Sequence, residues 1–249
     1  MTVLIGILCS DGVVIGADSS ATFATGHGAT TIEQKSKKVF AIGNSILIAG
    51  TGQVGVGQRF VEAVNNAWDN KAFLNLTKIE YGKHLCNLGI TEFISTQCPK
   101  GVFGALVAYP CAKAAHLCEL AVADFQPEWK TKEEWFVSMG SGQAITDPFL
   151  AFLKRVFYKN RQPTVREALF LASWALNHVI ELNPGGINGP SQIATITFDT
   201  KGSPCASVLT DDQIGEHLDS AEGAEKHLAD YMQKLNGSPR PGDPVVPTA

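Results

Sequence analysis

Three residues near the start of the sequence could together perform nucleophilic chemistry. Thr2 follows the initiator methionine, and a small residue at this position normally permits methionine removal, so we expect the mature chain to begin with threonine. A terminal threonine supplies a hydroxyl nucleophile and an α-amino group with a pKa of about 7.7 to 8.0, suited to a general base at neutral pH. A lysine ammonium such as Lys38 would stabilise the alkoxide, and Asp18 would keep that lysine charged and oriented.

Each of these residues also has an ordinary explanation. Many proteins begin with Met-Thr, and Asp18 and Lys38 could form a structural ion pair at adjacent strand ends. Lys35 and Lys37 are also in range, and the chemistry alone does not choose among the three lysines; Lys38 is preferred for the Val39 that follows it, on the resemblance described below.

A glycine pattern downstream raises a different hypothesis. Gly50 to Gly55, GTGQVG, has the G-x-G-x-x-G spacing of a dinucleotide-binding turn. That fold needs a second parallel strand ending in Asp or Glu soon after the first helix, but the chain after Trp68 reads DNKAFLNLTKIEYGK, which contains no such strand. The dinucleotide hypothesis is therefore disfavoured.

Neither a metal nor a cofactor is expected. His178 and Glu181 have helical spacing compatible with a metal, but no third ligand accompanies them, and a packed core histidine is the commoner case. The six cysteines form no C-x-x-C pair, and several lie in apolar strand-like runs, so we expect reduced, structural thiols.

Composition narrows the class of protein. A chain of 249 residues with 45% hydrophobic content can form one large core. The net charge of -4, with no run of Lys or Arg longer than Lys37-Lys38, argues against a nucleic-acid or membrane surface. The N-terminal apolar run has no basic leader and is too short to span a bilayer, so a cytoplasmic location is expected.

Periodicity predicts the elements that position these residues. Strands are expected at 3–9 and 13–17, joined by an Asp-Gly hairpin, at 38–42 and 46–49, at 102–109, 115–122 and 135–139, and at 191–199 and 203–210. Helices are expected from Gln53, over about 80–97, from Asp147-Pro148, from the capping box Thr164–Glu167, and over about 211–235.

This order of elements predicts an α+β fold. Antiparallel strands, two helices, more strands, two helices and a final hairpin favour a four-layer α-β-β-α sandwich of two antiparallel sheets flanked by helices. We expect one domain over residues 2–235, followed by a flexible Pro/Gly-rich tail over 236–249.

Several motifs resemble one known family. Residues 2–22, TVLIGILCSDGVVIGADSSAT, closely resemble the start of mature proteasome β-subunits. Lys37-Lys38-Val39 resembles the family's Lys-Lys-Val/Ile, Thr51-Gly52-Gln53 its small-Gly-x turn, and Met139 to Gly142 its G-S-G segment before the third helix. The motifs occur in family order, so the sequence is identified by resemblance as a proteasome β-type N-terminal-nucleophile hydrolase.

The resemblance implies catalytic roles. Thr2 would be the nucleophile and, through its amine, the proton acceptor, with Lys38 the catalytic lysine and Asp18 its partner. The backbone N–H of Gly52 would bind the developing oxyanion at a strand-to-helix turn, with Gly50 as a neighbouring candidate for substrate binding.

Further roles follow from the same resemblance. Ser141 corresponds to a serine near the terminal amine, and Thr22 to a residue whose backbone pairs with an extended peptide substrate. The family's Asp and Ser before Gly-Gly align with Glu181 and Pro184. Pro184 has no hydroxyl and no N–H, which puts the usual hydrogen bonds around the amine in doubt. Four extra residues also lie between Asp18 and Lys38, lengthening the loop beside the substrate cleft.

The resulting hypothesis is a threonine endopeptidase that cleaves peptides or unfolded proteins inside a ring-shaped chamber. The resemblance implies homo-oligomeric stacked rings of seven, with six as the alternative, and the departures suggest a divergent bacterial homologue such as the betaproteobacterial proteasome homologue. No motif indicates whether an ATPase unfoldase serves the chamber. A vestigial ring subunit and a small-molecule N-terminal-nucleophile amidase are the rival hypotheses.

Overall fold

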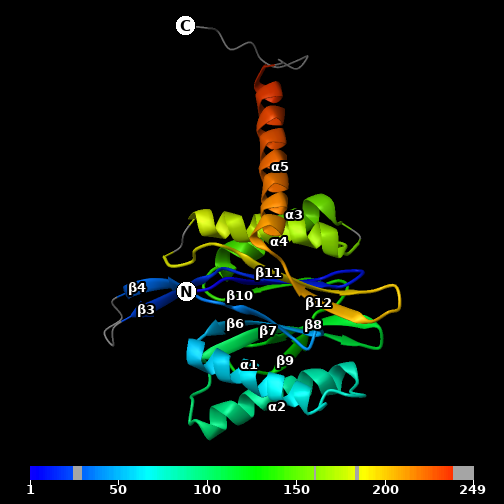
Figure 1. Ribbon diagram of the computed structural model, residues 1–249. Coiled ribbons are helices and arrows are strands. Elements are labelled where there is room, and N and C mark those ends of the chain that lie inside the picture. Colours follow the sequence, from blue (N-terminus) through cyan, green and yellow to red (C-terminus); the bar gives the residue numbers. More distant parts are fainter. Residues whose placement is uncertain (25–29, 160, 183–184, 238–249) are drawn as a thin grey trace.

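The expected four-layer sandwich is confirmed by a computed structural model, which describes residues 1–24, 30–159, 161–182 and 185–237. Two five-stranded sheets form the middle layers, and helices cover the outer face of each (Figure 1). All strand pairs are antiparallel, as the hairpin signals predicted.

The first sheet carries the chain start and has the order β10-β1-β2-β11-β12. Its strands are β1 Leu4–Leu8, β2 Val13–Ala17, β10 Phe136–Met139, β11 Gln192–Phe198 and β12 Pro204–Val208. The Asp-Gly turn joins β1 to β2, with Leu4 opposite Ala17. This register places Thr2 and Asp18 at the same end of the sheet, two residues and one residue beyond the last pair.

The second sheet has the order β5-β6-β7-β8-β9. Its strands are β5 Val39–Ile42, β6 Ile46–Gly52, β7 Phe103–Cys111, β8 Ala114–Leu120 and β9 Pro127–Trp129, the last of which was not predicted. Gly43 and Asn44 both have positive φ as the central residues of the turn between β5 and β6, which the Ser45 N–H closes by donating to the Ile42 carbonyl at 3.0 Å.

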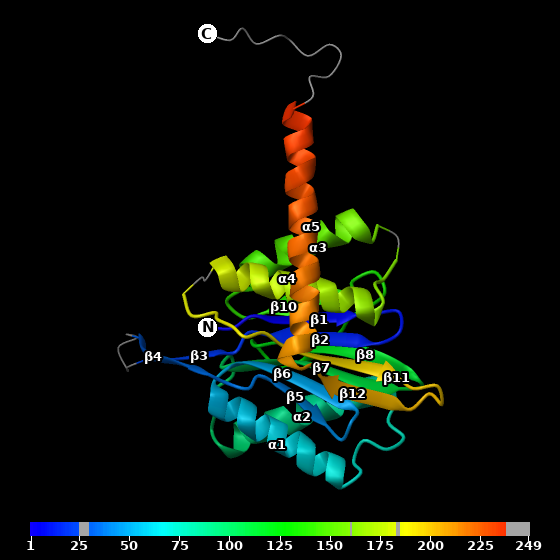
Figure 2. The same ribbon diagram turned by 45° about the horizontal axis from the view of Figure 1, so that its top comes forward.

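A separate two-stranded hairpin replaces the loop expected after Asp18. β3 Ser20–Ala24 pairs with β4 Thr30–Lys35 and lies beside the N-terminus in both views (Figures 1 and 2). Its tip, residues 25–29, lies outside the described part. The extra residues between Asp18 and Lys38 therefore belong to a hairpin arm next to Thr2.

The helices form the outer layers. α1 Val54–Asp69 and α2 Lys78–Ser95 cover the second sheet, and α3 Gln143–Phe157 and α4 Val165–Leu182 cover the first, with α5 Asp211–Gly237 packed on α4. In the described part of the chain, none of them is long and apolar enough to cross a membrane.

One predicted helix start was wrong. α3 begins at Gln143, so Pro148 lies inside the helix and does not start it. The first turn forms upstream because the Gly142 carbonyl accepts hydrogen bonds from the N–H groups of Ile145 and Thr146 and from the Thr146 hydroxyl. The capping box at the start of α4 is confirmed, since Thr164 and Glu167 exchange side-chain and backbone hydrogen bonds.

Two apolar cores hold the layers together. One fills the space between the two sheets and under α3 and α4, and the other lies between the second sheet and the α1–α2 layer. β1 and β2 are buried along their whole length, because a central strand of a sandwich is covered on both faces. The site at the end of these strands therefore rests on a rigid base.

Candidate functional site

Thr2 is fixed by the turn that precedes α3. Its backbone N–H donates to Ser141 Oγ at 3.1 Å, and its carbonyl accepts from the Gly142 N–H at 3.2 Å. Gly140 has a φ of +90°, and a Cβ there would lie 2.3 Å from the Thr2 carbonyl oxygen, so only glycine permits this approach. Ser141 thus lies next to the backbone nitrogen of Thr2, as the resemblance implied.

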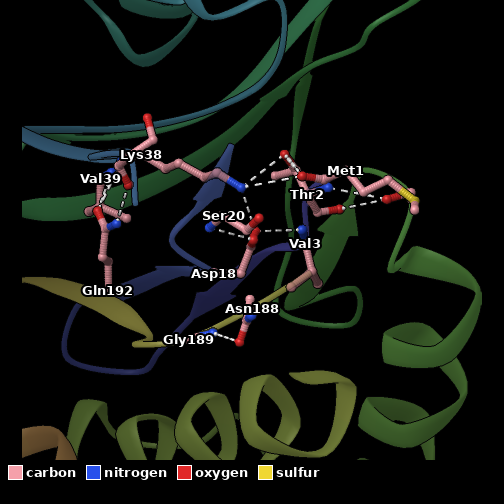
Figure 3. Close-up of polar contacts among 12 residues, drawn as sticks. Met1, Thr2, Val3, Asp18, Ser20, Lys38, Val39, Asn188, Gly189 and Gln192 are labelled. Carbon is pink, nitrogen blue, oxygen red and sulfur yellow. Dashed lines mark hydrogen bonds and ion pairs between the residues drawn. The ribbon is translucent and has the colours of Figure 1, made fainter. Parts of the chain in front are cut away.

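Lys38 joins Thr2 to Asp18. Its ammonium nitrogen lies 3.1 Å from Thr2 Oγ1 and 2.7 Å from Asp18 Oδ1, as Figure 3 shows. All three residues are buried, with exposed fractions of 9% for Thr2, 8% for Lys38 and 0% for Asp18. The structure thus brings the three predicted residues into one hydrogen-bonded row.

The other two lysines in range point elsewhere. Lys35 and Lys37 are exposed, and the Lys37 ammonium lies 5.1 Å from the centre of the Phe40 ring. Because side chains alternate along an extended chain, Lys38 faces inward where Lys37 faces out. The choice of Lys38 rested on the Val39 that follows it, and within the described residues Lys38 is the one of the three lysines whose ammonium lies within hydrogen-bond distance of Thr2 Oγ1.

Asp18 is held by two backbone groups in addition to Lys38. Its Oδ1 accepts from the Val3 N–H and its Oδ2 from the Ser20 N–H, both at 3.0 Å. Three donors on one buried carboxylate fix its orientation. Asp18 is therefore a rigid anchor for the lysine.

Burial dominates the electrostatics of Lys38. It lowers the pKa of the ammonium from its ordinary value of 10.5, while the Asp18 carboxylate opposes that change. Glu33 on β4 acts in the same sense as Asp18, more weakly. The pKa of Lys38 is therefore lower than that of an exposed lysine, and the carboxylates of Asp18 and Glu33 limit the decrease.

Gly52 ends β6 at the mouth of a cavity beside Thr2. Its φ is +107°, and a Cβ there would lie 2.1 Å from the Val102 carbonyl oxygen, so the backbone requires glycine. The residue is exposed and lines the cavity together with Thr2. Gly50 lines the same cavity, but its N–H already donates to the Lys38 carbonyl at 3.4 Å, which favours Gly52 as the donor for an oxyanion.

The cavity itself has a volume of about 290 Å³. Its wall includes the apolar side chains of Phe40, Ile48, Val61 and Phe103. Polar groups of Ser20, Ser36, Gln53 and Gln58 also line it. A concave apolar pocket with a polar rim next to a buried nucleophile can hold one side chain of a bound peptide.

Thr22 lies in the hairpin arm beside this cavity. It occupies β3, opposite Glu33 of β4, and the same strand contributes Ser20 and Ala21 to the cavity wall. Within the described residues β3 pairs with β4 alone. Its other edge can accept an extended peptide strand.

Glu181 is not brought to the site. It lies in the last turn of α4, is exposed, and accepts a hydrogen bond from Asn177 one turn earlier at 2.8 Å. In the described part of the chain its carboxylate has no hydrogen bond or ion pair with Thr2, Ser141 or Lys38. The residue aligned with the family's serine, Pro184, lies outside the described residues.

Gln192 is a site residue that the sequence did not indicate. Its side-chain oxygen accepts from the N–H groups of Lys38 and Val39 at 2.9 and 3.2 Å, and its amide nitrogen donates to the Ser36 carbonyl at 2.7 Å. Figure 3 shows Gln192 beneath the backbone of Lys38 and Val39. Gln192 and Lys38 are 154 residues apart in sequence, and only the pairing of β11 with β2 places them together.

His178 has a packing role. Its ring stacks on Phe149 with the ring centres 4.4 Å apart. Across the described residues, no group of three or more His, Cys, Asp or Glu side chains is arranged to hold a metal ion.

Comparisons with known proteins agree with the fold and with the motifs. A family model described as Proteasome subunit matches residues 2–189. Among solved structures, the chain is similar to a Gly-1 mutant of Anbu from Hyphomicrobium sp. strain MC1, with a TM-score of 0.69 and 12% identity, covering 98% of this chain and 100% of that chain. At this identity the likeness shows the fold alone. No curated protein matches the sequence.

Proposed function

Because the chain belongs to the proteasome subunit family, we propose that it is a threonine endopeptidase with Thr2 as its nucleophile. The observation that carries this proposal is the buried row Thr2–Lys38–Asp18, with Lys38 Nζ 3.1 Å from Thr2 Oγ1. A buried, paired lysine aimed at a hydroxyl oxygen is an arrangement that stabilises an alkoxide.

The proposed reaction has two stages. After Met1 is removed, the free α-amine of Thr2 takes the hydroxyl proton while Oγ1 attacks the scissile carbonyl carbon. The Gly52 N–H stabilises the oxyanion, and collapse of the intermediate expels the amine product with the proton. Water then attacks the ester on Thr2, releases the acid product and regenerates the hydroxyl.

The substrate class follows from the cavity. The apolar wall of Phe40, Ile48, Val61 and Phe103 favours an apolar side chain on the residue whose carbonyl is attacked. The free edge of β3, which includes Thr22, would pair with the peptide backbone. Peptides and unfolded chains, which can become extended, fit this mode of binding, whereas a compact small-molecule amide would leave the strand edge unused.

Members of this family form stacked rings. We propose that this chain forms a homo-oligomeric double ring of seven subunits per ring, with six as the alternative, and acts in the cytoplasm. Sedimentation velocity of the purified chain measures the particle mass. A monomer would remove the chamber from the proposal.

Peptide hydrolysis tests the proposal directly. Purified protein from which Met1 has been removed is expected to cleave fluorogenic peptides with an apolar residue before the cleaved bond faster than matched peptides with an acidic one. Thr2→Ala abolishes cleavage, and Thr2→Ser retains part of it. Cleavage by Thr2→Ala would exclude this nucleophile, and an inactive wild-type protein without Met1 would favour the vestigial subunit.

A further inference from the structure

The last helix carries one apolar seam along its whole length. Apolar residues recur in α5 at alternating spacings of four and three, with Glu225 at the one polar position of the series; they are Ile214, Leu218, Ala221, Leu228, Met232 and Leu235. This spacing places them on a single face, as in helices that pack on another helix.

The seam is covered over only half of the helix. Ile214 and Ala221 are 5% and 3% exposed because that part of α5 packs on α4, where Trp174 donates a hydrogen bond to Glu225 at 2.6 Å. The far half of α5 rises out of the body (Figures 1 and 2), and its residues 225–234 are all exposed. Leu228 and Met232 are 54% and 55% exposed there.

Tyr231 extends this uncovered surface. It is 60% exposed and lies beside the seam, one residue before Met232. We call Leu228, Tyr231 and Met232 the distal seam. A free segment of about 12 residues is marginal as an isolated helix, so a helix that projects this far is stable mainly when its apolar face has a partner.

A second uncovered apolar stripe lies in the same layer of the molecule. Phe152, Val156 and Phe157 of α3 are 41%, 47% and 46% exposed. Phe152 and Val156 are one turn apart on one helix face. The chain's own α5 leaves this stripe uncovered because it projects away from the body.

We propose that the distal seam of α5 packs on the α3 stripe of a second copy of this chain, which faces the first across the α3–α4 layer. A copy in this position is the one that a helix rising from this layer can reach. The contact is reciprocal under two-fold symmetry, since each copy offers both a projecting seam and a receiving stripe.

The area available is enough for a specific contact. Given the size of aromatic and aliphatic side chains, the six exposed residues present on the order of 600 Å² per copy. A two-fold pair would bury on the order of 1,200 Å² from these side chains alone, the lower end of specific protein interfaces. Two rings stacked through this layer would repeat the contact for every facing pair.

This inference deepens the proposed assembly and does not depend on the chemistry of Thr2. The peptidase proposal concerns Thr2 and is tested by labelling of Thr2. The packing of α5 is tested by particle mass and by cross-linking. The two can therefore fail separately.

The test compares three full-length variants by sedimentation velocity. Leu228→Glu/Met232→Glu on α5 and Phe152→Glu/Val156→Glu on α3 are each expected to reduce the particle mass at least twofold. The helical circular dichroism should fall by no more than the contribution of the distal segment of α5, about 12 residues, because that segment depends on its partner and the substituted side chains are exposed in the single chain. Ala229→Glu/Gln233→Glu is the matched control, since it adds the same charge at the same spacing about 100° around α5 from the seam, on the side away from Tyr231, and it leaves the mass unchanged.

Site-directed photo-cross-linking gives an independent result. A benzophenone amino acid at Tyr231 is expected to yield a dimer on a denaturing gel, with the cross-link in the α3 peptide 143–157. A wild-type monomer, equal effects of the seam and control variants, or a cross-link within one chain or to a different surface would each overturn the proposal.

Discussion

The ammonium nitrogen of Lys38 lies 3.1 Å from Thr2 Oγ1 in a pocket where both side chains are buried. This contact depends on a charged Lys38. Burial lowers the pKa of Lys38, and the Asp18 carboxylate, 2.7 Å away, raises it. The same lysine also lies 3.5 Å from the Met1 carbonyl oxygen. The site is thus organised around one charged nitrogen before Met1 is removed.

The pH dependence of peptide hydrolysis should be bell-shaped. The rate rises as the Thr2 amine loses its proton, near pH 7.7 to 8.0 for an unperturbed amine. It falls again when Lys38 loses its charge, and because burial lowers that pKa the alkaline limb lies below pH 10.5.

Variants of the two carboxylates check the assignment of the alkaline limb. Removing Asp18 takes away a group that raises the Lys38 pKa, so the residual activity of Asp18→Asn should fall at lower pH than that of wild type. Glu33→Gln should shift the limb in the same direction by less. An alkaline limb that is identical in all three proteins would assign it to another group.

Gln192 should act as a positioning residue for Lys38. Gln192→Ala removes three hydrogen bonds to the segment 36–39 and is expected to lower kcat roughly 10- to 100-fold with little change in KM. Gln192→Glu keeps the acceptor for the Lys38 N–H and should recover part of that loss. Gln126→Ala, at an exposed position, is the control. Equal changes in kcat and KM, or no recovery with Glu, would argue against positioning.

Gly52 and Gly55 form a matched pair of glycines. Gly52→Ala introduces a Cβ 2.1 Å from the Val102 carbonyl oxygen at a positive φ, so the turn must move and hydrolysis should fall about 100- to 1,000-fold. Gly55→Ala meets only Arg59 Nη1 at 3.9 Å inside α1, and should stabilise the protein by up to about 1 kcal/mol with activity unchanged. Kinetics and thermal unfolding of both variants decide the matter, and a fully active Gly52→Ala would remove Gly52 from the mechanism.

The cap of α4 should give a defined acid dependence of stability. The hydrogen bond with Arg161 lowers the pKa of Glu167 to about 2 from an ordinary 4.5, so its ionised form stabilises the fold above pH 4.5 and that stabilisation is lost as pH falls through 2. The midpoint temperature of thermal unfolding should be higher for wild type than for Glu167→Gln. This difference should be largest above pH 4.5 and should decrease as the pH falls below 4.5. A difference independent of pH would mean that the ionised pair does not contribute.

Local sequence signals predicted much of this fold. The Asp-Gly turn between β1 and β2 and the capping box of Thr164 and Glu167 are short-range patterns whose geometry is set within a few residues. The α3 start was missed because its first turn is held by the carbonyl of Gly142, a backbone contact with no side-chain signature. The β3–β4 hairpin was missed because β4, TTIEQK, is mostly polar and its residues 32–35 are all exposed, so they show no alternation of apolar and polar positions.

The site residues also separate into those that a local motif predicted and those that it did not. Thr2, Asp18, Lys38 and Ser141 stand in motifs that could be aligned, and they meet in space. Glu181 was placed by alignment alone and lies instead on the exposed end of α4 with Asn177. Gln192 could not be predicted, because its amide contacts a segment that only strand pairing brings near.

The most direct test of the central claim is the intact mass of the purified protein before and after incubation with a peptide epoxyketone, followed by peptide mapping. An epoxyketone forms a stable ring with an N-terminal threonine only when amine and hydroxyl act together. The account predicts a mass that lacks Met1 and gains one inhibitor, with the adduct on Thr2. Protein that lacks Met1 and gains no adduct, or that gains one on another residue, would contradict it.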